Sequence, residues 1–297
     1  MKKEIGYFGL GRMGKAMVQN LLDHGYRVAV SNRSPAPVDE MKQQGAVGVY
    51  TPEELVHELE RPRALWLMVA AGEAVDDTIK KLEPHLSEDD ILIDGGNSRF
   101  KDSIRRAKYL KDSGIHFLDI GTSGGIDGAR NGACLMIGGD RKVYDCLEDL
   151  FKDSSCPNGY LYCGNSGSGH FVKMVHNAVE YGMMESIAEG FDLLKKAPDS
   201  LGKMNLKDIA EVWNHGSVVH SWLVELVGEA FERDEELNHV SSQIGDNGEG
   251  RWAVETALEQ GVAMPMVALA ICNRLRSRSD FSNKIVSALR YEFGRHK

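Results

Sequence analysis

Residues 9–14, Gly-Leu-Gly-Arg-Met-Gly, constrain the fold of this chain most, because they follow a short apolar run and open an amphipathic stretch. In a G-x-G-x-x-G turn between a strand and a helix, Gly9 permits the tight turn and Gly11 lets the backbone approach a pyrophosphate. Gly14 allows the helix to pack closely on the sheet, and the helix N-terminus then attracts the diphosphate. The segment predicts a dinucleotide site made by Gly9, Leu10, Gly11, Arg12, Met13 and Gly14.

Apolar runs that alternate with amphipathic segments predict a Rossmann-type, doubly wound α/β sheet in the first half. The ligand cleft of such a sheet lies at the carboxyl ends of its strands. The runs lie at 5–9, 27–31, 46–49, 64–69, 91–94, 117–120, 134–137 and 160–163. Helix-like segments lie near 12–24, 36–44, 52–60, 73–83 and 99–113.

The pattern changes at a Gly/Ser-rich stretch, residues 164–169, after which helical periods replace the strand-like runs. The periods cover 168–196, 206–213, 218–233, 250–260, 265–277 and 280–290. We therefore expect a dinucleotide-binding domain over residues 1–164. An all-helical domain for substrate binding and oligomerisation is expected over residues 165–297.

Charge and composition narrow the function. The chain has 35 Lys and Arg against 44 Asp and Glu, a formal charge of −9, which argues against a nucleic-acid surface. Five irregularly spaced cysteines do not form a disulfide framework. No window approaches the ~18–20 apolar residues of a membrane span. The expectation is a soluble, cytoplasmic protein that binds a small molecule.

The end of the second predicted strand bears on the choice of coenzyme. Asn32, Arg33 and Ser34 occupy the place where an Asp or Glu would bind the ribose of NAD. Arg33 offers a donor fork suited to a 2′-phosphate, which favours NADP over NAD, although an exposed Arg stacking on adenine is the alternative. Later strand ends add Val69, Ala70, Ala71 and Asn97 as cofactor contacts.

One predicted helix carries an unusual polar stripe. Lys173, His176, Asn177, Glu180 and Tyr181 fall at offsets 0, 3, 4, 7 and 8 and so share one face. A solvated face with i,i+3 and i,i+4 pairs would explain the stripe, and so would a cleft wall that carries an acid and a base. The turn Ser123-Gly124-Gly125 resembles a cradle for a small anion or carboxylate.

These motifs together resemble decarboxylating 6-phosphogluconate dehydrogenase, over residues 5–296. The resemblance rests on GLGRMG, LIDGGNS, TSGG followed by GARNG, and GSGHFVKMVHNAVEYGMME. The wider β-hydroxyacid dehydrogenase class shares the glycine fingerprint, the S-G-G turn and a Lys with an Asn four residues on, but not generally the His-Asn pair with Glu-Tyr. The chain looks like a short form of the family.

The resemblance implies oxidative decarboxylation of 6-phosphogluconate to ribulose 5-phosphate in pentose phosphate metabolism. It makes Lys173 the base and Glu180 the acid, with no metal. Asn247 and Glu249 stand where the long forms carry a Lys and a Thr that help hold the substrate phosphate. The tail, residues 290–296, matches an R-x-x-F-G-x-H ending that reaches a neighbouring subunit of a homodimer or homotetramer. The implied substrate contacts are Asn97, Ser123, Gly124, Gly125, His176, Asn177, Tyr181, Arg274, Arg290 and His296.

Two other functions fit the same residues less well. A related β-hydroxyacid dehydrogenase that acts on a small unphosphorylated acid, such as 3-hydroxyisobutyrate, would have no use for Arg274, Arg290 or His296. A non-catalytic NADP-binding module would not need Lys173 or Glu180, and both are present.

Overall fold

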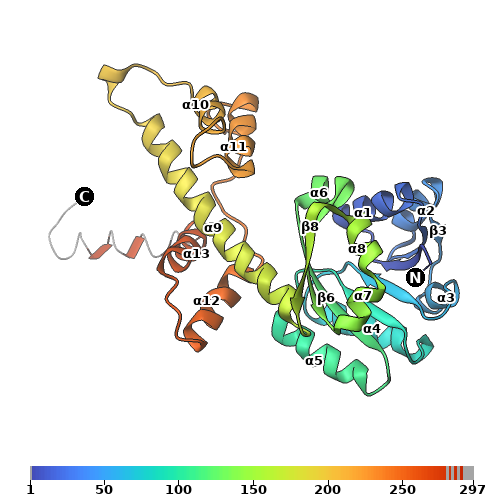
Figure 1. Cartoon of the computed structure of the whole chain (residues 1–297). Helices are drawn as coiled ribbons and strands as arrows, with labels where there is room; N and C mark the ends of the chain where they lie inside the picture. Colours follow the sequence, from blue (N-terminus) through green and yellow to red (C-terminus); the bar gives the residue numbers. More distant parts are fainter. Residues whose placement is uncertain (1, 279–280, 282–283, 286–287, 290–297) are drawn as a thin grey trace. The chain divides into compact units, whose positions relative to one another are not determined.

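The computed structural model describes residues 2–278, 281, 284–285 and 288–289. By its internal contacts the chain divides into two units, Met1–Val175 and His176–Lys297. The first is an α/β unit and the second is helical, as Figure 1 shows along its colour gradient. The predicted fold class is confirmed.

The first unit is built on one eight-stranded sheet in the order β3-β2-β1-β4-β5-β6-β7-β8. All neighbouring strands run parallel except β6 and β7, which are antiparallel. The chain reverses its direction of winding between β1 and β4, and ligands bind at such switch points. The strands are β1 Glu4–Phe8, β2 Arg27–Ser31, β3 Val47–Gly48, β4 Ala64–Leu67, β5 Ile91–Asp94, β6 His116–Ser123, β7 Ala133–Gly139 and β8 Ser155–Gly164.

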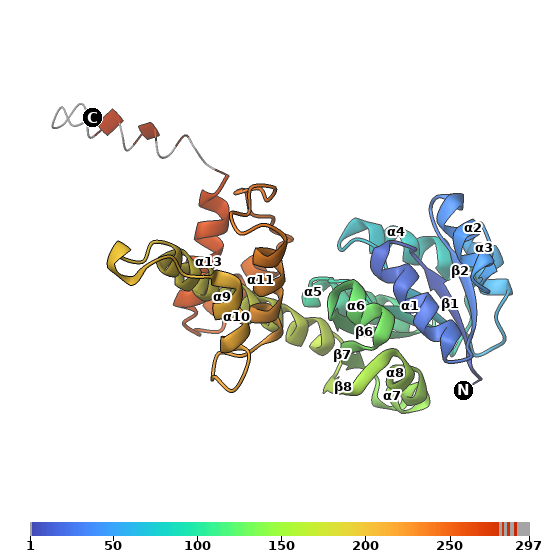
Figure 2. The same cartoon turned by 90° about the horizontal axis from the view of Figure 1, so that it is seen from above.

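Helices cover both faces of this sheet (Figure 1 and Figure 2) because its central strands are apolar on both sides. In β4, Trp66 packs in the core under one helical layer, whereas Leu65 and Leu67 pack under the other. The first layer holds α1 Arg12–Asp23, α2 Pro35–Gln43, α6 Gly125–Asn131, α7 Arg141–Cys146 and α8 Glu148–Ser154. The second holds α3 Pro52–His57, α4 Glu73–Leu82, the 3₁₀ turn η1 Glu83–His85 and α5 Phe100–Lys111.

Three short helices, α6, α7 and α8, were not expected from the sequence. Helix α6 contains Gly125 and Gly128, and each glycine in a helix costs about 1 kcal/mol relative to alanine, so the local pattern argues against it. Helices α7 and α8 are separated at Leu147, so neither is long enough to show a clear period.

The second unit contains the predicted helices. Helix α9, Ser168–Lys195, begins in the first unit and continues into the second. It is followed by η2 Asp199–Leu201, α10 Leu206–Trp213, α11 Trp222–Arg233, α12 Glu249–Glu259 and α13 Pro265–Arg276. Within the described residues, no strand follows Gly164. The helix expected over 280–290 falls largely on residues outside those described.

A small core holds α9, α10 and α11 together around Phe191, Ala210 and Phe231. In the described part of the chain, no helix combines the length and the apolar character that crossing a membrane requires.

Candidate active site

The glycine turn between β1 and α1 has the geometry that its three glycines predict. Gly9 has φ +107°, and a Cβ there would lie 2.3 Å from the carbonyl oxygen of Met68. A Cβ on Gly14 would lie 2.1 Å from the carbonyl oxygen of Gly9, so the helix packs directly on the turn. Around Gly11, by contrast, no described atom lies within 4 Å of an added Cβ. This open approach to the first turn of α1, which has no side-chain cap, suits a diphosphate.

The amide of Asn32 fastens this turn to the end of β2. Its Oδ1 accepts a hydrogen bond from the Leu10 N–H at 3.1 Å, and its Nδ2 donates to the carbonyl and hydroxyl oxygens of Ser34 at 3.2 and 3.1 Å. Arg33 is exposed, and no described side chain forms an ion pair with it. Its guanidinium is therefore available to a ligand at the end of β2.

The loops after β4 and β5 pack against each other through glycines. A Cβ on Gly95 would lie 1.9 Å from the indole nitrogen of Trp66, and one on Gly96 would lie 2.9 Å from the carbonyl oxygen of Val69. Ala70, Ala71 and Asn97 are exposed beside this contact. Since β4 and β5 are neighbouring parallel strands, their carboxyl ends offer Val69, Ala70, Ala71 and Asn97 at one edge of the sheet.

A buried arginine that the sequence analysis did not single out joins these two loops. Arg106 on α5 is 1% exposed, and its Nη2 donates to the carbonyl oxygen of Gly72 at 2.9 Å. Its Nη1 donates to Asp94 and Ser98 at 3.2 Å each, and its Nε donates to Asp76 at 2.9 Å. An arginine in an amphipathic helical segment is usually exposed, so the sequence offers no signal for this role.

Lys173 lies where α9 passes directly over β6. It is 6% exposed, and a Cβ on Gly121 would lie 2.2 Å from the Lys173 Cβ. A Cβ on Gly169 would lie 2.3 Å from the carbonyl oxygen of Asp119. Glycines on both elements thus allow helix and strand to touch backbone to backbone, which fixes the position of the lysine.

The carboxylate of Asp119 holds the start of α9. It accepts hydrogen bonds from the N–H groups of Gly167 and His170 at 2.6 and 2.9 Å. Burial raises the pKa of Asp119, while His170 and these backbone donors oppose the rise. The His170 ring pairs in turn with the Ser103 hydroxyl at 2.7 Å, which ties α9 to α5. Asp119, His170 and Ser103 are not among the site residues that the sequence predicts.

The predicted anion cradle, Ser123-Gly124-Gly125, begins at the end of β6, the strand that Lys173 contacts. Ser123 ends β6, two residues after Gly121, and Gly124 and Gly125 have φ +114° and +62°. Such left-handed positions turn successive N–H groups toward one side. Strand β6 therefore brings the lysine and the Ser-Gly-Gly turn together.

Farther along α9, the polar side chains are close to one another. His176 Nδ1 lies 3.2 Å from Asn177 Oδ1 and 3.7 Å from Glu180 Oε2. Asn177 is 7% exposed, and Glu180 is half-buried. Because α9 is one continuous helix, the spacing of four residues between Lys173 and Asn177 places both on one side of it.

Tyr181 and Arg274 form a second cluster inside the helical unit. The Arg274 guanidinium lies 3.7 Å from the centre of the Tyr181 ring, and its Nη1 donates to the carbonyl oxygen of Gly245 at 2.9 Å. A Cβ on Gly250 would lie 2.8 Å from the same ring, and the backbone of Asn247 hydrogen-bonds the tyrosine. Burial and the Glu249 carboxylate raise the pKa of Tyr181, and Arg274 opposes them.

The segment 245–250, which ends in the first turn of α12, thus contacts two expected substrate residues, Tyr181 and Arg274, and its Glu249 is buried. Arg290 and His296 lie outside the described residues.

The fold and the glycine turn define a Rossmann-type dehydrogenase with a helical second unit. A family model described as the NAD binding domain of 6-phosphogluconate dehydrogenase matches residues 4–164. A second, the C-terminal domain of 6-phosphogluconate dehydrogenase, matches residues 169–293. The chain belongs to the 6-phosphogluconate dehydrogenase family.

This chain is similar to family members of two different lengths. The NAD(+)-dependent, decarboxylating 6-phosphogluconate dehydrogenase of Haloferax volcanii is 42% identical over 298 residues, 99% of this chain and 98% of that protein. The NADP(+)-dependent, decarboxylating enzyme of Bacillus subtilis is 39% identical over 290 residues, but the match covers 93% of this chain and 61% of that protein. This chain is therefore the length of the Haloferax protein and spans under two thirds of the Bacillus enzyme.

Solved structures agree with this assignment. The Plasmodium falciparum 6-phosphogluconate dehydrogenase is 31% identical with a TM-score of 0.85, and the match covers 98% of this chain and 65% of that chain. A 3-hydroxyisobutyrate dehydrogenase of Mycobacterium tuberculosis is 22% identical with a TM-score of 0.77, covering 94% of this chain and 95% of that one. The second likeness shows the shared fold alone.

Proposed function

We propose that this chain oxidises 6-phosphogluconate at C3 and decarboxylates the product to ribulose 5-phosphate, with an NAD(P) coenzyme. The observation that carries the proposal is the buried Lys173 fixed over Gly121 of β6, the strand whose end begins the Ser123-Gly124-Gly125 turn. The family assignment supplies the substrate, because the two family models together match nearly the whole chain. It favours this substrate over 3-hydroxyisobutyrate and over a non-catalytic role.

The coenzyme would be held at the glycine turn of residues 9–14, with Val69, Ala70, Ala71 and Asn97 at the neighbouring strand ends. The open space at Gly11 and the uncapped start of α1 fit its diphosphate. Bound there, the nicotinamide supplies the acceptor for the hydride that leaves C3. Arg33 would bind a 2′-phosphate, which favours NADP, while Asn32 and Ser34 shape the loop around it.

The chemistry falls to two side chains of α9. Neutral Lys173 accepts the proton of the 3-hydroxyl as the C3–H bond breaks, which leaves a 3-keto acid. The ammonium of Lys173 then polarises the new carbonyl while the C1–C2 bond breaks and carbon dioxide leaves. The C3 oxygen takes the proton of Lys173, which gives the enediol. Glu180 then donates a proton to the carbon that lost carbon dioxide while neutral Lys173 takes back the proton of the C3 hydroxyl, and the ketose forms. The C3 carbonyl accepts the electrons of the breaking bond, and Lys173 polarises it as a metal ion would, so no metal is required.

The other residues bind and orient the substrate. Ser123, Gly124 and Gly125 would hold the carboxylate, and Asn97, His176 and Asn177 would orient the hydroxyls. Tyr181 and Arg274 would bind the phosphate, with Arg290 and His296 completing that site. The Arg274 guanidinium is held for this role by its contact with the Tyr181 ring.

The helical unit also supports a homo-oligomer, either a dimer or a tetramer, whose tail reaches the neighbouring active site. Large apolar side chains are exposed on its helices, including Met183, Leu193, Leu258 and Leu269. A twin subunit would cover such surfaces. We also propose a domain boundary between residues 164 and 165, in the interval that separates the two family-model matches.

The direct test measures reduced nicotinamide from 6-phosphogluconate, with NADP and NAD side by side and carbon dioxide trapped. The proposal expects one carbon dioxide for each reduced coenzyme, and the same rate after treatment with EDTA. A chain that binds the coenzyme but turns over only 3-hydroxyisobutyrate would refute the substrate assignment. Loss of activity with EDTA in a protein that stays folded and still binds the coenzyme, restored by a divalent metal, would refute the role of Lys173 in polarising the carbonyl.

A further inference from the structure

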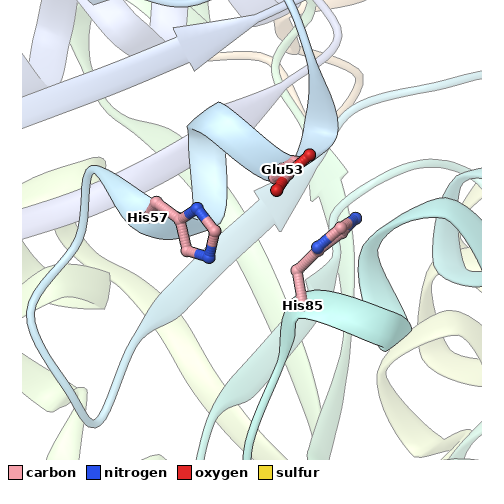
Figure 3. Close-up of side chains that lie close together, drawn as sticks. All are labelled: Glu53, His57 and His85. Atoms are coloured by element: carbon pink, nitrogen blue, oxygen red, sulfur yellow. The ribbon is translucent and has the colours of Figure 1, made fainter.

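Three side chains of types that can bind a metal converge within the first unit, and none of them is assigned to catalysis. Glu53 and His57 come from α3, and His85 comes from η1 (Figure 3). One ligand atom from each lies within 4.8 Å of the others. Among the described residues, no other group of three His, Cys, Asp or Glu side chains meets this criterion.

Helix α3 presents its two donors on a fixed frame. Its start is held by a capping box, in which the Thr51 hydroxyl accepts from the Glu54 N–H at 3.1 Å while the Glu54 side chain accepts from the Thr51 N–H at 3.2 Å. Leu55 and Val56 are fully buried in the core. Glu53 and His57 are four positions apart, which places them on one side of the helix.

The third donor stands on an equally fixed turn. Leu82, just before η1, is fully buried, and Glu83 accepts hydrogen bonds from Tyr109 and Ser113 at 2.6 and 3.1 Å. The carbonyl oxygen of His85 faces Arg63 Nη1 at 3.4 Å. The two imidazole rings lie 6.1 Å apart, centre to centre, at 77° to each other (Figure 3). The donors therefore converge from two separately anchored elements.

The donor chemistry selects the ion. Two imidazoles and one carboxylate suit late first-row divalent cations such as Zn²⁺ and Ni²⁺ better than Mg²⁺ or Ca²⁺. A tetrahedral ion with bonds near 2.0–2.1 Å needs donors roughly 3.4 Å apart. Glu53 and His57 are exposed and His85 is half-buried, so small side-chain rotations can close the remaining distance.

We propose that Glu53, His57 and His85 form a binding site for one late first-row divalent cation that joins α3 to the turn after α4. With three protein ligands, the ion keeps at least one position for water. Both elements cover the same face of the sheet, so the bound ion stabilises the dinucleotide-binding unit. The site is independent of the proposed catalysis, in which none of the three residues takes part.

The test uses Ni²⁺ as the probe, titrated calorimetrically into the full-length, chelator-treated and reduced protein. Loss of an outer-shell partner already weakens metal binding by about 10–100-fold, so loss of a direct ligand should cost at least tenfold. We expect that loss in both His57→Ala and His85→Ala. His116→Ala is the matched control, because His116 is a half-exposed histidine of the same unit that lies 3.5 Å from Asp89.

A second readout separates binding from folding. All three substitutions lie at accessible positions, so the metal-free proteins should unfold at similar temperatures, and Ni²⁺ should raise the unfolding temperature of wild type and His116→Ala only. The proposal would be overturned if either His57→Ala or His85→Ala lost less than tenfold in Ni²⁺ affinity, or if His116→Ala lost as much affinity as they do. Because the readout is affinity, a failure here leaves the activity assay untouched.

Discussion

Arg106 Nη1 donates to Asp94 Oδ2 over 3.2 Å, and both side chains are only 1% exposed. The same guanidinium reaches the carbonyl oxygen of Gly72, while the other Asp94 oxygen accepts from the Gly96 N–H. One buried ion pair therefore fixes the loops after β4 and β5 relative to each other. Since both loops carry expected cofactor contacts, we expect the pair to position the coenzyme.

Arg106→Lys should weaken both stability and coenzyme binding. Lysine cannot reproduce the fork that bonds Gly72, Asp76 and Asp94 together, and hydrogen bonds to charged groups contribute about 1.5–3 kcal/mol each. We expect a loss of about 3 kcal/mol in the free energy of unfolding by urea, and about a tenfold rise in the coenzyme KM. The neighbouring Arg105→Lys, on the exposed side of Asp76, should change the free energy of unfolding and the coenzyme KM much less.

Lys173→Met should abolish the proton transfer while preserving the side-chain length. General-base catalysis is worth about 10²–10⁴-fold, so kcat should fall by that factor while coenzyme binding persists. Lys195→Met on the same helix is the control, because its ammonium pairs with Glu236 at the surface. A Lys173→Met enzyme that kept more than about a tenth of wild-type kcat would rule out the role of the base.

Arg274→Lys should raise the KM for 6-phosphogluconate with little change in kcat. Lysine lacks the planar fork that stacks on Tyr181 and bonds Gly245, so the cation would no longer be fixed for the phosphate. We expect about a tenfold rise in KM. Arg276→Lys, two residues on and exposed, should behave like wild type. If the two variants gave the same KM, Arg274 would not bind the phosphate.

Arg33→Gln should separate the two coenzymes. If Arg33 binds the 2′-phosphate, its loss removes a charge-assisted contact and raises the KM for NADP by about tenfold. The KM for NAD, which lacks that phosphate, should stay within about threefold. Steady-state kinetics with both coenzymes measure the ratio. An equal rise for both would show that Arg33 stacks on adenine instead.

Asp76→Asn should flatten the acid dependence of stability. Burial opposes ionisation of Asp76, but hydrogen bonds from Arg106 and Arg105 outweigh it and lower its pKa to about 2. A folded-state pKa below the unfolded value of 3.8 contributes stability above pH 4, which is lost as the pH falls from 4 toward 2. Urea unfolding should therefore show a steeper loss for wild type than for Asp76→Asn over that range. The exposed Asp77→Asn should follow wild type.

The sequence predicts the sheet well because its strands are nearly continuous apolar runs between turns. Residues 64–67 and 91–94 are buried along their whole length, and such runs are recognisable without any tertiary information. The antiparallel pairing of β7 with β6 cannot be predicted from the local sequence, because it depends on the tertiary arrangement of the strands. Helix α6 is not predicted from the sequence, because Gly125 and Gly128 disfavour the helix that nevertheless forms.

Some residues of the candidate site can likewise be predicted from the sequence, and others cannot. Lys173, Asn177 and Glu180 are predictable because one helix carries them at fixed spacings. The contacts of Arg106 with Asp76 and Asp94 join residues 30 and 12 positions apart, and nothing local distinguishes Arg106 from the exposed Arg105 beside it. His57 and His85 are likewise distant in sequence, so only the packing of η1 beside α3 brings them together.

The three hydrogen bonds of Asn32 have a consequence for redesigning coenzyme preference. An Asp at this position could still accept from the Leu10 N–H, but it could not donate to Ser34, and its charge would face the Ser34 carbonyl oxygen. Converting this amide to an acid, the obvious exchange for favouring NAD, would keep the bond to the glycine turn but loosen the loop after β2 that Asn32 and Ser34 form. A swap of selectivity is therefore better built at Arg33, whose side chain is not committed to holding the loop.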